Sequence, residues 1–346
     1  MSKPIKFAII GAGNIAEFHA RAIGLVEGAE LGAVHSRTQA PGQAFAAKFD
    51  CRYAADLDDI LTDPTIDAVA ITTPSGTHRD IGIAAAKAGK HVLCEKPLDI
   101  TVERIDALVA ACDAAGVKLG AIFQSRFGAG AQAARDAVQT GRFGKLAQCS
   151  AYIPWYRSAE YYGSAGWRGT WDLDGGGALM NQGIHAVDLL LWLAGDVVTV
   201  SAKCQTRLHD IEVEDNAVAW LQFAHGGIGV IQASTCCSPG ERKRIEIKGE
   251  KGSVTLVDDE PVFWQFAEEL PQDADVRALA GNAQIGGGAS DPKAISVEGH
   301  RAQYADFVGA LQEGRPPAVP GREGRKAVAL IRAIYESSRK GTTVTL

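Results

Sequence analysis

The sequence lacks several features that would place a protein in a membrane, on nucleic acid or around a structural metal. It has no run of 18 uninterrupted apolar residues, so we expect no transmembrane helix. Acidic residues outnumber basic ones, 41 against 35, for a net charge of −6. Binding to nucleic acid needs clustered Lys and Arg, so we expect no such partner. The seven cysteines are irregularly spaced without a Cys-x-x-Cys pair, which predicts reduced thiols in the cytoplasm and no metal site.

Two domains are expected from the length of 346 residues and from a change of pattern near residue 122. Before that point, short apolar runs alternate with helical segments, which predicts a parallel sheet covered on both faces. The expected strands are 5–10, 29–35, 67–72, 90–94 and 117–122. Thr101 is a suitable N-cap and Gly116 a suitable terminator for the helix between them. The first domain is therefore 1–122, of α/β class.

The second expected domain, 123–346, groups its strands together instead of alternating them with helices. This grouping predicts an α+β domain with a large, mostly antiparallel sheet. The expected strands are 146–156, 198–207, 217–223, 229–234, 244–249 and 253–257, and the expected helices are 131–140, 180–193, 298–313 and 321–340. Residues 271–297 are expected to form an irregular loop, and the last helix is expected to pack back on the first domain.

A glycine-rich turn follows the first expected strand. The sequence Gly11-Ala12-Gly13-Asn14-Ile15-Ala16 is a G-x-G-x-x-A pattern that opens a helix. Gly11 permits a tight turn, and Gly13 has no Cβ to obstruct a pyrophosphate. The N–H groups at the helix start, including those of Asn14 and Ile15, favour negative charge. The pattern in this context predicts a dinucleotide site.

The end of the second strand indicates which dinucleotide binds. A carboxylate there would accept hydrogen bonds from both ribose hydroxyls and favour NAD(H). The sequence has Ser36 and Arg37 instead, which suit a 2′-phosphate. We therefore predict NADP(H), with NAD(H) as the alternative. If NAD(H) binds instead, Arg37 would stack on the adenine or point to solvent.

Two further loops follow parallel strands at the edge where ligands bind. The first is Thr73-Pro74-Ser75-Gly76-Thr77-His78, and the second is Glu95-Lys96-Pro97. Gln124 and Arg126 come just after the last strand and are expected at the same cleft. The expected cofactor contacts of this group are Thr73, Pro74, His78, Glu95, Lys96 and Gln124.

Taken together, the motifs resemble those of the Gfo/Idh/MocA family of NAD(P)-dependent sugar and polyol oxidoreductases. The matching stretches are GAGNIA at 11–16, TPSGTH at 73–78, CEKPL at 94–98 and GGGALMNQGIHAVDLL at 175–190. They occur in both halves and in the family's order. The resemblance implies a Rossmann domain followed by a domain with a large open sheet. In this family that sheet commonly forms homodimers or homotetramers.

The resemblance also implies roles for individual residues. Lys96 matches the family's catalytic lysine, which contacts the reacting hydroxyl and the nicotinamide ribose. His185 matches the catalytic histidine. Asn181 stands where the family often has Asp, and an amide cannot act as a base. The Asn-Gln-Gly-Ile-His version resembles the branch that includes nucleotide-sugar 3-dehydrogenases.

The residues themselves support a role for His185. On a helix from about residue 180, Asn181, His185 and Asp188 would share one face. A histidine suits proton transfer near neutral pH, and Asp188 would fix its tautomer. Alternatively, His185 packs in the core and is satisfied by Asp188. In the expected chemistry His185 takes the hydroxyl proton as hydride leaves, and Lys96 stabilises the developing alkoxide.

The stretch 152–174 is rich in aromatic residues and arginine, which suit the faces and polar groups of sugars. The expected substrate contacts are Lys96, Arg126, Tyr156, Arg157, Trp167, Arg168, Asn181 and His185. A surface that docks a neighbouring subunit is the alternative for this stretch. An acidic or phosphorylated sugar, a neutral monosaccharide and inositol all remain open as substrates. Two other functions also remain open: a cofactor-binding sensor without turnover, and a redox-neutral NAD-dependent glycoside hydrolase.

Overall fold

The computed structural model describes residues 3–281, 288–289 and 296–346. The chain divides into two compact units. The first comprises Met1–Phe123 and His300–Arg325, and the second comprises Gln124–Gly299 and Lys326–Leu346. Residues 300–325 thus pack with the N-terminal part of the chain, through contacts such as the hydrogen bond from the Phe123 N–H to the Gln303 side chain (3.0 Å).

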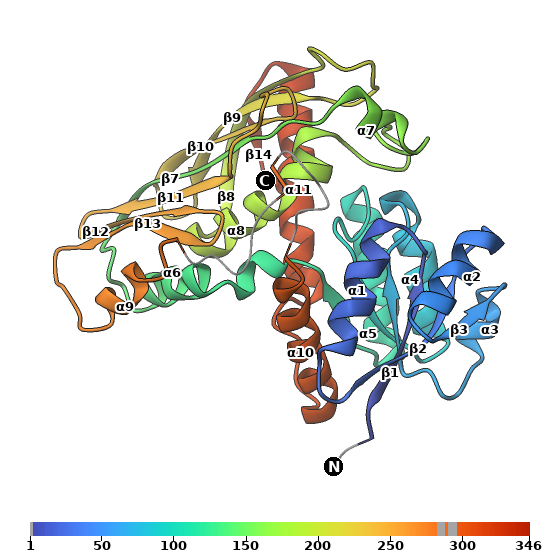
Figure 1. Ribbon diagram of the computed structural model, residues 1–346. Helices are drawn as coiled ribbons and strands as arrows, with labels where there is room; N and C mark the ends of the chain where they lie inside the picture. The colour runs from blue at the N-terminus through green and yellow to red at the C-terminus, as the bar shows by residue number, and fades with distance from the viewer. Residues whose placement is uncertain (1–2, 282–287, 290–295) are drawn as a thin grey trace. The chain divides into compact units, whose positions relative to one another are not determined.

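The first unit is built on a six-stranded parallel sheet of order β3-β2-β1-β4-β5-β6 (Figure 1). Its strands are β1 (Ile5–Ile10), β2 (Ala29–His35), β3 (Arg52–Ala54), β4 (Ala68–Ile71), β5 (His91–Cys94) and β6 (Leu119–Ala121). Its helices are α1 (Asn14–Gly24), α2 (Gln39–Lys48), α3 (Asp58–Leu61), α4 (His78–Lys87), α5 (Val102–Ala115) and α10 (Glu298–Glu313). Every residue of β4 is buried, as expected for a strand covered on both faces. This confirms the predicted α/β Rossmann class.

Local signals act in this unit as the sequence predicts. The Thr101 hydroxyl accepts the N–H of Arg104 (3.3 Å) at the start of α5. Gly116 ends the same helix with φ +68°, a left-handed conformation that glycine adopts without strain. The short strand β3 is not among the predicted elements because it has only three residues.

The second unit contains an eight-stranded sheet of order β13-β12-β11-β7-β10-β9-β8-β14 (Figure 1). All neighbours pair antiparallel except β7 and β10, which are parallel. The strands are β7 (Leu146–Pro154), β8 (Val197–Gln205), β9 (Asn216–Phe223), β10 (Ile228–Ser234), β11 (Arg244–Gly249), β12 (Gly252–Val257), β13 (Glu260–Phe266) and β14 (Val344–Thr345). The predicted α+β class with a large, mostly antiparallel sheet is confirmed.

Helices α6 (Ala129–Gln139) and α8 (Ile184–Ala194) pack against strands of this sheet. The remaining helices are α7 (Ala159–Gly163), α9 (Asp273–Arg277) and α11 (Gly321–Lys340), the last of which begins in the first unit and ends in the second. Along β9 buried and exposed residues alternate, and the exposed set includes Val218 and Trp220. Ile228 on β10 is also exposed. Exposed apolar side chains on a sheet suit a contact between subunits. The homo-oligomer that the resemblance implies stays a prediction.

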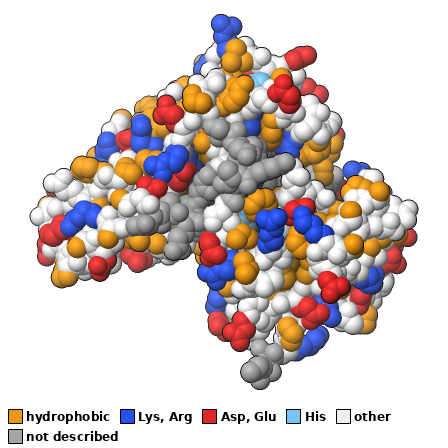
Figure 2. All heavy atoms as spheres, viewed as in Figure 1, with side chains coloured by type: hydrophobic (Ala, Val, Ile, Leu, Met, Phe, Trp, Pro, Cys, Tyr) orange, Lys and Arg blue, Asp and Glu red, His pale blue; other side chains and the backbone are white. Residues whose placement is uncertain are grey.

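Two differences from the predicted elements stand out. Strand β13 falls where no strand is expected, and α9 falls within the expected irregular loop. The rest of that loop, 282–287 and 290–295, lies outside the described residues. None of the described helices is both long and apolar enough to cross a membrane. On the face visible in Figure 2, positive and negative side chains are interspersed in small groups.

Candidate active site

The glycine-rich turn has the geometry of a phosphate cradle. Gly11 adopts φ +109°, and a Cβ there would lie 2.9 Å from the carbonyl oxygen of Thr72. Gly13 is exposed, and a Cβ there would meet no atom within 4 Å. Among the described residues no side chain caps the start of α1, so its first N–H groups have no side-chain acceptor there. These N–H groups and this space fit the pyrophosphate of a dinucleotide.

At the end of β2 the chain offers hydroxyls and a cation. The Ser36 hydroxyl accepts the N–H of Thr38 (3.3 Å), and the Ser36 carbonyl accepts the hydroxyl of Tyr53 (3.2 Å). Arg37 is exposed. Ser36 is therefore held in place, whereas Arg37 lies at the surface where an adenosine ribose or its phosphate would bind.

The loops after β4 and β5 are joined through His78. Its Nδ1 lies 2.8 Å from the carbonyl oxygen of Pro97, and its Nε2 lies 2.8 Å from that of Thr73. Since β4 and β5 are neighbours in the sheet, His78 connects the two loops that frame their carboxyl ends. Lys96 is half-buried in the second loop. His78 itself is buried and shapes these loops, and its predicted contact with the cofactor stays a prediction.

In the second unit, a tight turn leads to the predicted catalytic histidine. A Cβ on Gly177 would lie 2.0 Å from the carbonyl oxygen of Glu214, so only glycine fits. The Glu214 carboxylate accepts the N–H groups of Gly177 (3.0 Å) and Leu179 (2.8 Å) and the hydroxyl of Tyr335 (2.9 Å). Burial raises the pKa of Glu214 to about 7, although these donors favour its anion.

The helix that carries His185 does not begin as expected. Residues Ala178–Gly183 form a π-helical segment, and α8 starts only at Ile184. Of the three residues expected on one helical face, Asn181 therefore lies in the π-helical segment, whereas His185 and Asp188 are three residues apart within α8. His185 is half-buried in the first turn of α8.

The structure gives Asn181 and Asp188 partners that the sequence did not predict. The Asn181 amide donates to the carboxylate of Asp174, a buried residue. A carboxylate thus contacts the amide that stands where the family often has Asp. Asp188 is buried and accepts two N–H groups of Arg126, at 2.6 and 2.8 Å. Arg126, a predicted substrate contact, is itself buried in this ion pair.

Two other predicted contacts are also buried. The Arg157 guanidinium donates to the Gln182 side chain and to the carbonyl oxygens of Tyr156, Gly288 and Ala289. These four acceptors indicate a structural role for Arg157. Gln124 is buried as well, yet its side-chain oxygen has no hydrogen-bond partner in the described part of the chain. An oxygen of this kind suits a donor on a bound ligand.

Arg168 differs from Arg157 in its contacts. Its guanidinium lies 4.3 Å from the ring centre of Tyr161 and 4.7 Å from that of Trp167. It donates to the Tyr161 hydroxyl at 2.5 Å, and its Nε has no acceptor among the described residues. Both Arg168 and Trp167 are half-buried. The aromatic rings hold Arg168 in place, and its buried Nε, without an acceptor among the described residues, suits an anionic ligand.

Tyr161 and Gln182 connect these groups, although neither is among the predicted substrate contacts. The Gln182 amide donates to the Tyr161 hydroxyl (2.8 Å) and to the Asn181 side chain (2.9 Å). Arg168, Tyr161, Gln182 and Asn181 therefore form one hydrogen-bonded series within the second unit. The position of Gln182 beside Asn181 in the motif was the available signal. Tyr156 is half-buried, and its N–H is bonded to the carbonyl oxygen of Ala289 (3.1 Å).

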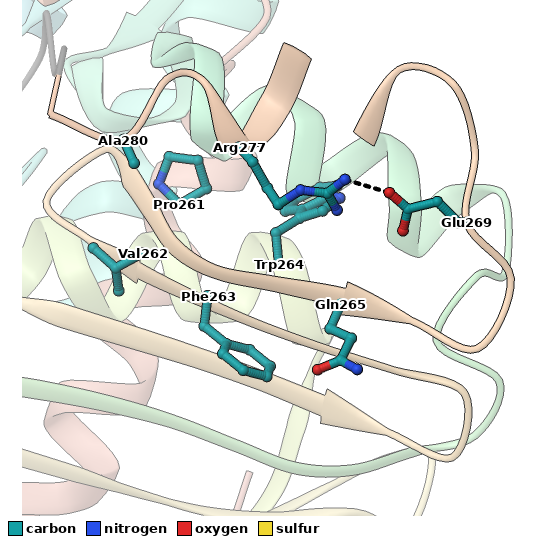
Figure 3. A pocket seen from close by; sticks show the side chains of 8 residues that line it. All are labelled: Pro261, Val262, Phe263, Trp264, Gln265, Glu269, Arg277 and Ala280. Atoms are coloured by element: carbon teal, nitrogen blue, oxygen red, sulfur yellow. Dashed lines mark hydrogen bonds and ion pairs between the residues drawn. The ribbon is translucent and has the colours of Figure 1, made fainter. Parts of the chain in front are cut away.

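A separate hollow of about 520 Å³ lies on β13 beside α9 (Figure 3). Its lining includes Phe263, Trp264 and an ion pair between Arg277 and Glu269. None of the predicted site residues lines it, and its charged groups already pair with each other. This hollow is therefore not the candidate active site.

Folding also gathers two groups of possible metal ligands that sequence spacing did not reveal. They are His19, Glu95 and His300 in the first unit, and His209, Asp215 and Cys236 in the second. Within each group the carboxylate already accepts hydrogen bonds, from His19 and Lys96 in one case and from backbone N–H groups in the other. The expectation of no metal stays a prediction.

Comparison with known proteins identifies the family of the chain. Residues 5–123 match the family model of the oxidoreductase family with an NAD-binding Rossmann fold, and residues 131–255 match that of the Gfo/Idh/MocA C-terminal domain. The chain belongs to the Gfo/Idh/MocA oxidoreductase family. As the motifs predict, it is an oxidoreductase that transfers hydride between a nicotinamide cofactor and a CH–OH carbon of a sugar, sugar derivative or polyol.

Solved structures of this family resemble the chain over its full length. The WlbA dehydrogenase of Bordetella pertussis, in complex with NADH and UDP-GlcNAcA, is 36% identical with a TM-score of 0.90, covering 100% of this chain and 98% of that one. The Chromobacterium violaceum WlbA dehydrogenase, with the same two ligands, is 34% identical with a TM-score of 0.91, covering 100% and 97%. Inositol 2-dehydrogenase of Rhizobium meliloti is 28% identical, covering 96% of each chain. The sensor and glycosidase alternatives gain no support from these relatives.

Proposed function

We propose that this family member is a dehydrogenase of a nucleotide-linked sugar acid, with Lys96 and His185 as its catalytic residues. The observation that carries the proposal is the full-length similarity to two dehydrogenases whose structures hold NADH and UDP-GlcNAcA. The half-buried Arg168, whose Nε has no acceptor among the described residues, suits such a substrate better than a neutral polyol.

In the proposed reaction, hydride passes from the sugar carbon to C4 of the nicotinamide, the chemistry that the bound cofactor supplies. His185 accepts the hydroxyl proton. The Lys96 ammonium stabilises the developing alkoxide by a charge-assisted hydrogen bond. Asn181 donates to Asp174 and accepts from Gln182, so these two contacts hold in place the amide that would orient the sugar.

A substrate panel tests this assignment. The purified protein with either dinucleotide is given UDP-GlcNAcA, UDP-GlcNAc, which lacks only the sugar carboxylate, and myo-inositol, while the reduced-nicotinamide absorbance is followed. We expect turnover on the acid and much slower turnover on the other two. Preference for myo-inositol would contradict the nucleotide-sugar assignment and leave the family's chemistry intact.

Replacing Arg168 by Met should raise the KM for the acidic substrate by about 10- to 100-fold, because a hydrogen bond to a charged group contributes about 1.5–3 kcal/mol. The aromatic residues around position 168 can still enclose an apolar side chain of similar length. Turnover of UDP-GlcNAc should change little. Arg168→Lys is the matched control that keeps the charge but loses the planar fork. Equal losses on both substrates would show that Arg168 only supports the fold.

We propose further that Arg37 gives the dinucleotide site a preference for NADP(H), while NAD(H) still binds. The support is local: Arg37 is exposed at the end of β2, and neither Ser36 nor Arg37 is acidic. The two WlbA structures hold NADH, so the preference is a feature in which this chain would differ from those proteins.

Arg37→Asp should reverse that preference. The substitution removes the cation that pairs with a 2′-phosphate and adds a repulsive carboxylate, so we expect at least a 10-fold weaker Kd for NADPH. The Kd for NADH should stay within a few-fold, as measured by fluorescence titration. A wild-type protein that binds NADH more tightly than NADPH would overturn the prediction.

A further inference from the structure

The carboxylate of Glu95 contacts the backbone of Lys96. Glu95 is 5% exposed and follows β5. One of its oxygens accepts the N–H of Lys96 (3.0 Å), and the other lies 3.0 Å from Nε2 of His19. Glu95 therefore contacts both the loop that carries Lys96 and helix α1, whose first turn forms the phosphate cradle.

The protons of this cluster can be assigned from its contacts. Burial lowers the pKa of His19, which favours a neutral ring. Burial alone would raise the pKa of Glu95, but the hydrogen bond from His19 and the nearby His300 ring hold it well below the usual range. A neutral His19 then donates from Nε2 to the Glu95 anion, and its Nδ1 accepts the hydroxyl of Tyr304 at 2.7 Å. From Tyr304 through His19 to Glu95, each donor thus has an acceptor, whereas neither ring nitrogen of His300 has a hydrogen-bond partner among the described residues.

We propose that Glu95 and His19 are positioning residues for Lys96. Glu95 fixes the lysine backbone and supplies a buried negative charge that favours the ammonium form of its side chain. His19 holds Glu95 in place and keeps it ionised. This inference rests on the proposed catalytic role of Lys96. It explains why a charged side chain is kept in the interior, where an unpaired carboxylate would be costly.

Other charged or titratable groups near Glu95 come from each neighbouring element. His19 lies on α1, and His300 and Tyr304 lie on α10. His300 Nε2 is 3.5 Å from the carboxylate. Cys94 and Asp99 belong to the same segment as Glu95, and Asp99 is paired with Arg104 (2.5 Å). Of these groups, His19 makes the closest contact with the Glu95 side chain.

Glu95→Gln tests the proposal because it removes the charge and keeps an oxygen that can accept the Lys96 N–H. We expect the Lys96 pKa, read from the pH profile of kcat, to fall by about one unit or more, because loss of a nearby anion disfavours the ammonium. We expect kcat near neutral pH to fall about 10-fold or more, with the cofactor Kd within about 3-fold of wild type. An unchanged pH profile and kcat would overturn the proposal.

Two variants of His19 guard against misfolding as an explanation. His19→Leu removes the donor to Glu95 and should shift the profile in the same direction. His19→Gln retains a side-chain N–H and should restore the wild-type pH profile in part.

Asp273→Asn is the matched control, because it removes a buried carboxylate paired with Arg142 (2.6 Å) in the second unit. It should lower Tm and leave the pH profile unchanged. If Glu95→Gln does not fold, a wild-type profile in folded His19→Leu overturns the proposal. Wild-type kcat in Lys96→Met would instead overturn the catalytic assignment itself.

Discussion

Lys96→Met is expected to lower kcat by about 1,000-fold while the cofactor Kd stays within a few-fold of the wild-type value. A single preorganised donor to a developing oxyanion is worth about 100- to 1,000-fold, and an ammonium is a strong donor of this kind. Met retains most of the side-chain volume, so the half-buried position of Lys96 stays filled. Stopped-flow measurement of nicotinamide absorbance under saturating substrate gives kcat, and fluorescence titration gives the cofactor Kd.

Lys87→Met provides the control for this experiment. Lys87 is exposed in the last turn of α4, in the same unit as Lys96. Its replacement should leave kcat unchanged. Less than a 10-fold effect in Lys96→Met would show that this lysine does not stabilise the reacting oxygen.

The second large effect is expected for His185→Gln. General acid–base catalysis by a positioned side chain contributes about 100- to 10,000-fold, so we expect a loss of kcat in that range at neutral pH. Activity should recover as the pH is raised, because hydroxide can then replace the missing base. The pH profile of kcat, from pH 6 to 10, is the measurement that shows both effects.

His225→Gln is a suitable companion variant. His225 is an exposed histidine of the same unit whose Nε2 lies 3.1 Å from the carbonyl oxygen of Ala194. We expect its kcat and pH profile to resemble those of the wild type. If His185→Gln keeps the wild-type profile as well, His185 belongs to the core and another group accepts the proton.

Much of the first unit could be predicted because its signals are local. Apolar runs, the Thr101 cap and the Gly116 terminator each act within a few residues of themselves. Strand β13 was missed because Pro261 and the acidic residues before it weaken the strand pattern. Its pairing with β12, through an irregular register near Leu256, depends on tertiary contacts instead.

The sequence predicted the motifs of the site but not the contacts between its side chains. Sequence position predicted the cradle glycines, yet nothing in it separates Arg157, with four acceptors among the described residues, from Arg168, with one. The π-helical segment before His185 likewise depends on the carboxylate of Glu214, which lies far along the chain. Pairings of this kind join distant segments, and only the folded chain shows them.

The most direct test of the account follows the hydrogen that is transferred. The protein is incubated with oxidised dinucleotide and UDP-GlcNAcA deuterated at every ring carbon, and the cofactor is recovered for mass spectrometry. The account predicts one deuterium at C4 of the reduced nicotinamide, formed in the wild type and far more slowly in Lys96→Met and His185→Gln. A substrate consumed without deuterium in the cofactor, or labelling at the wild-type rate in both variants, would contradict it.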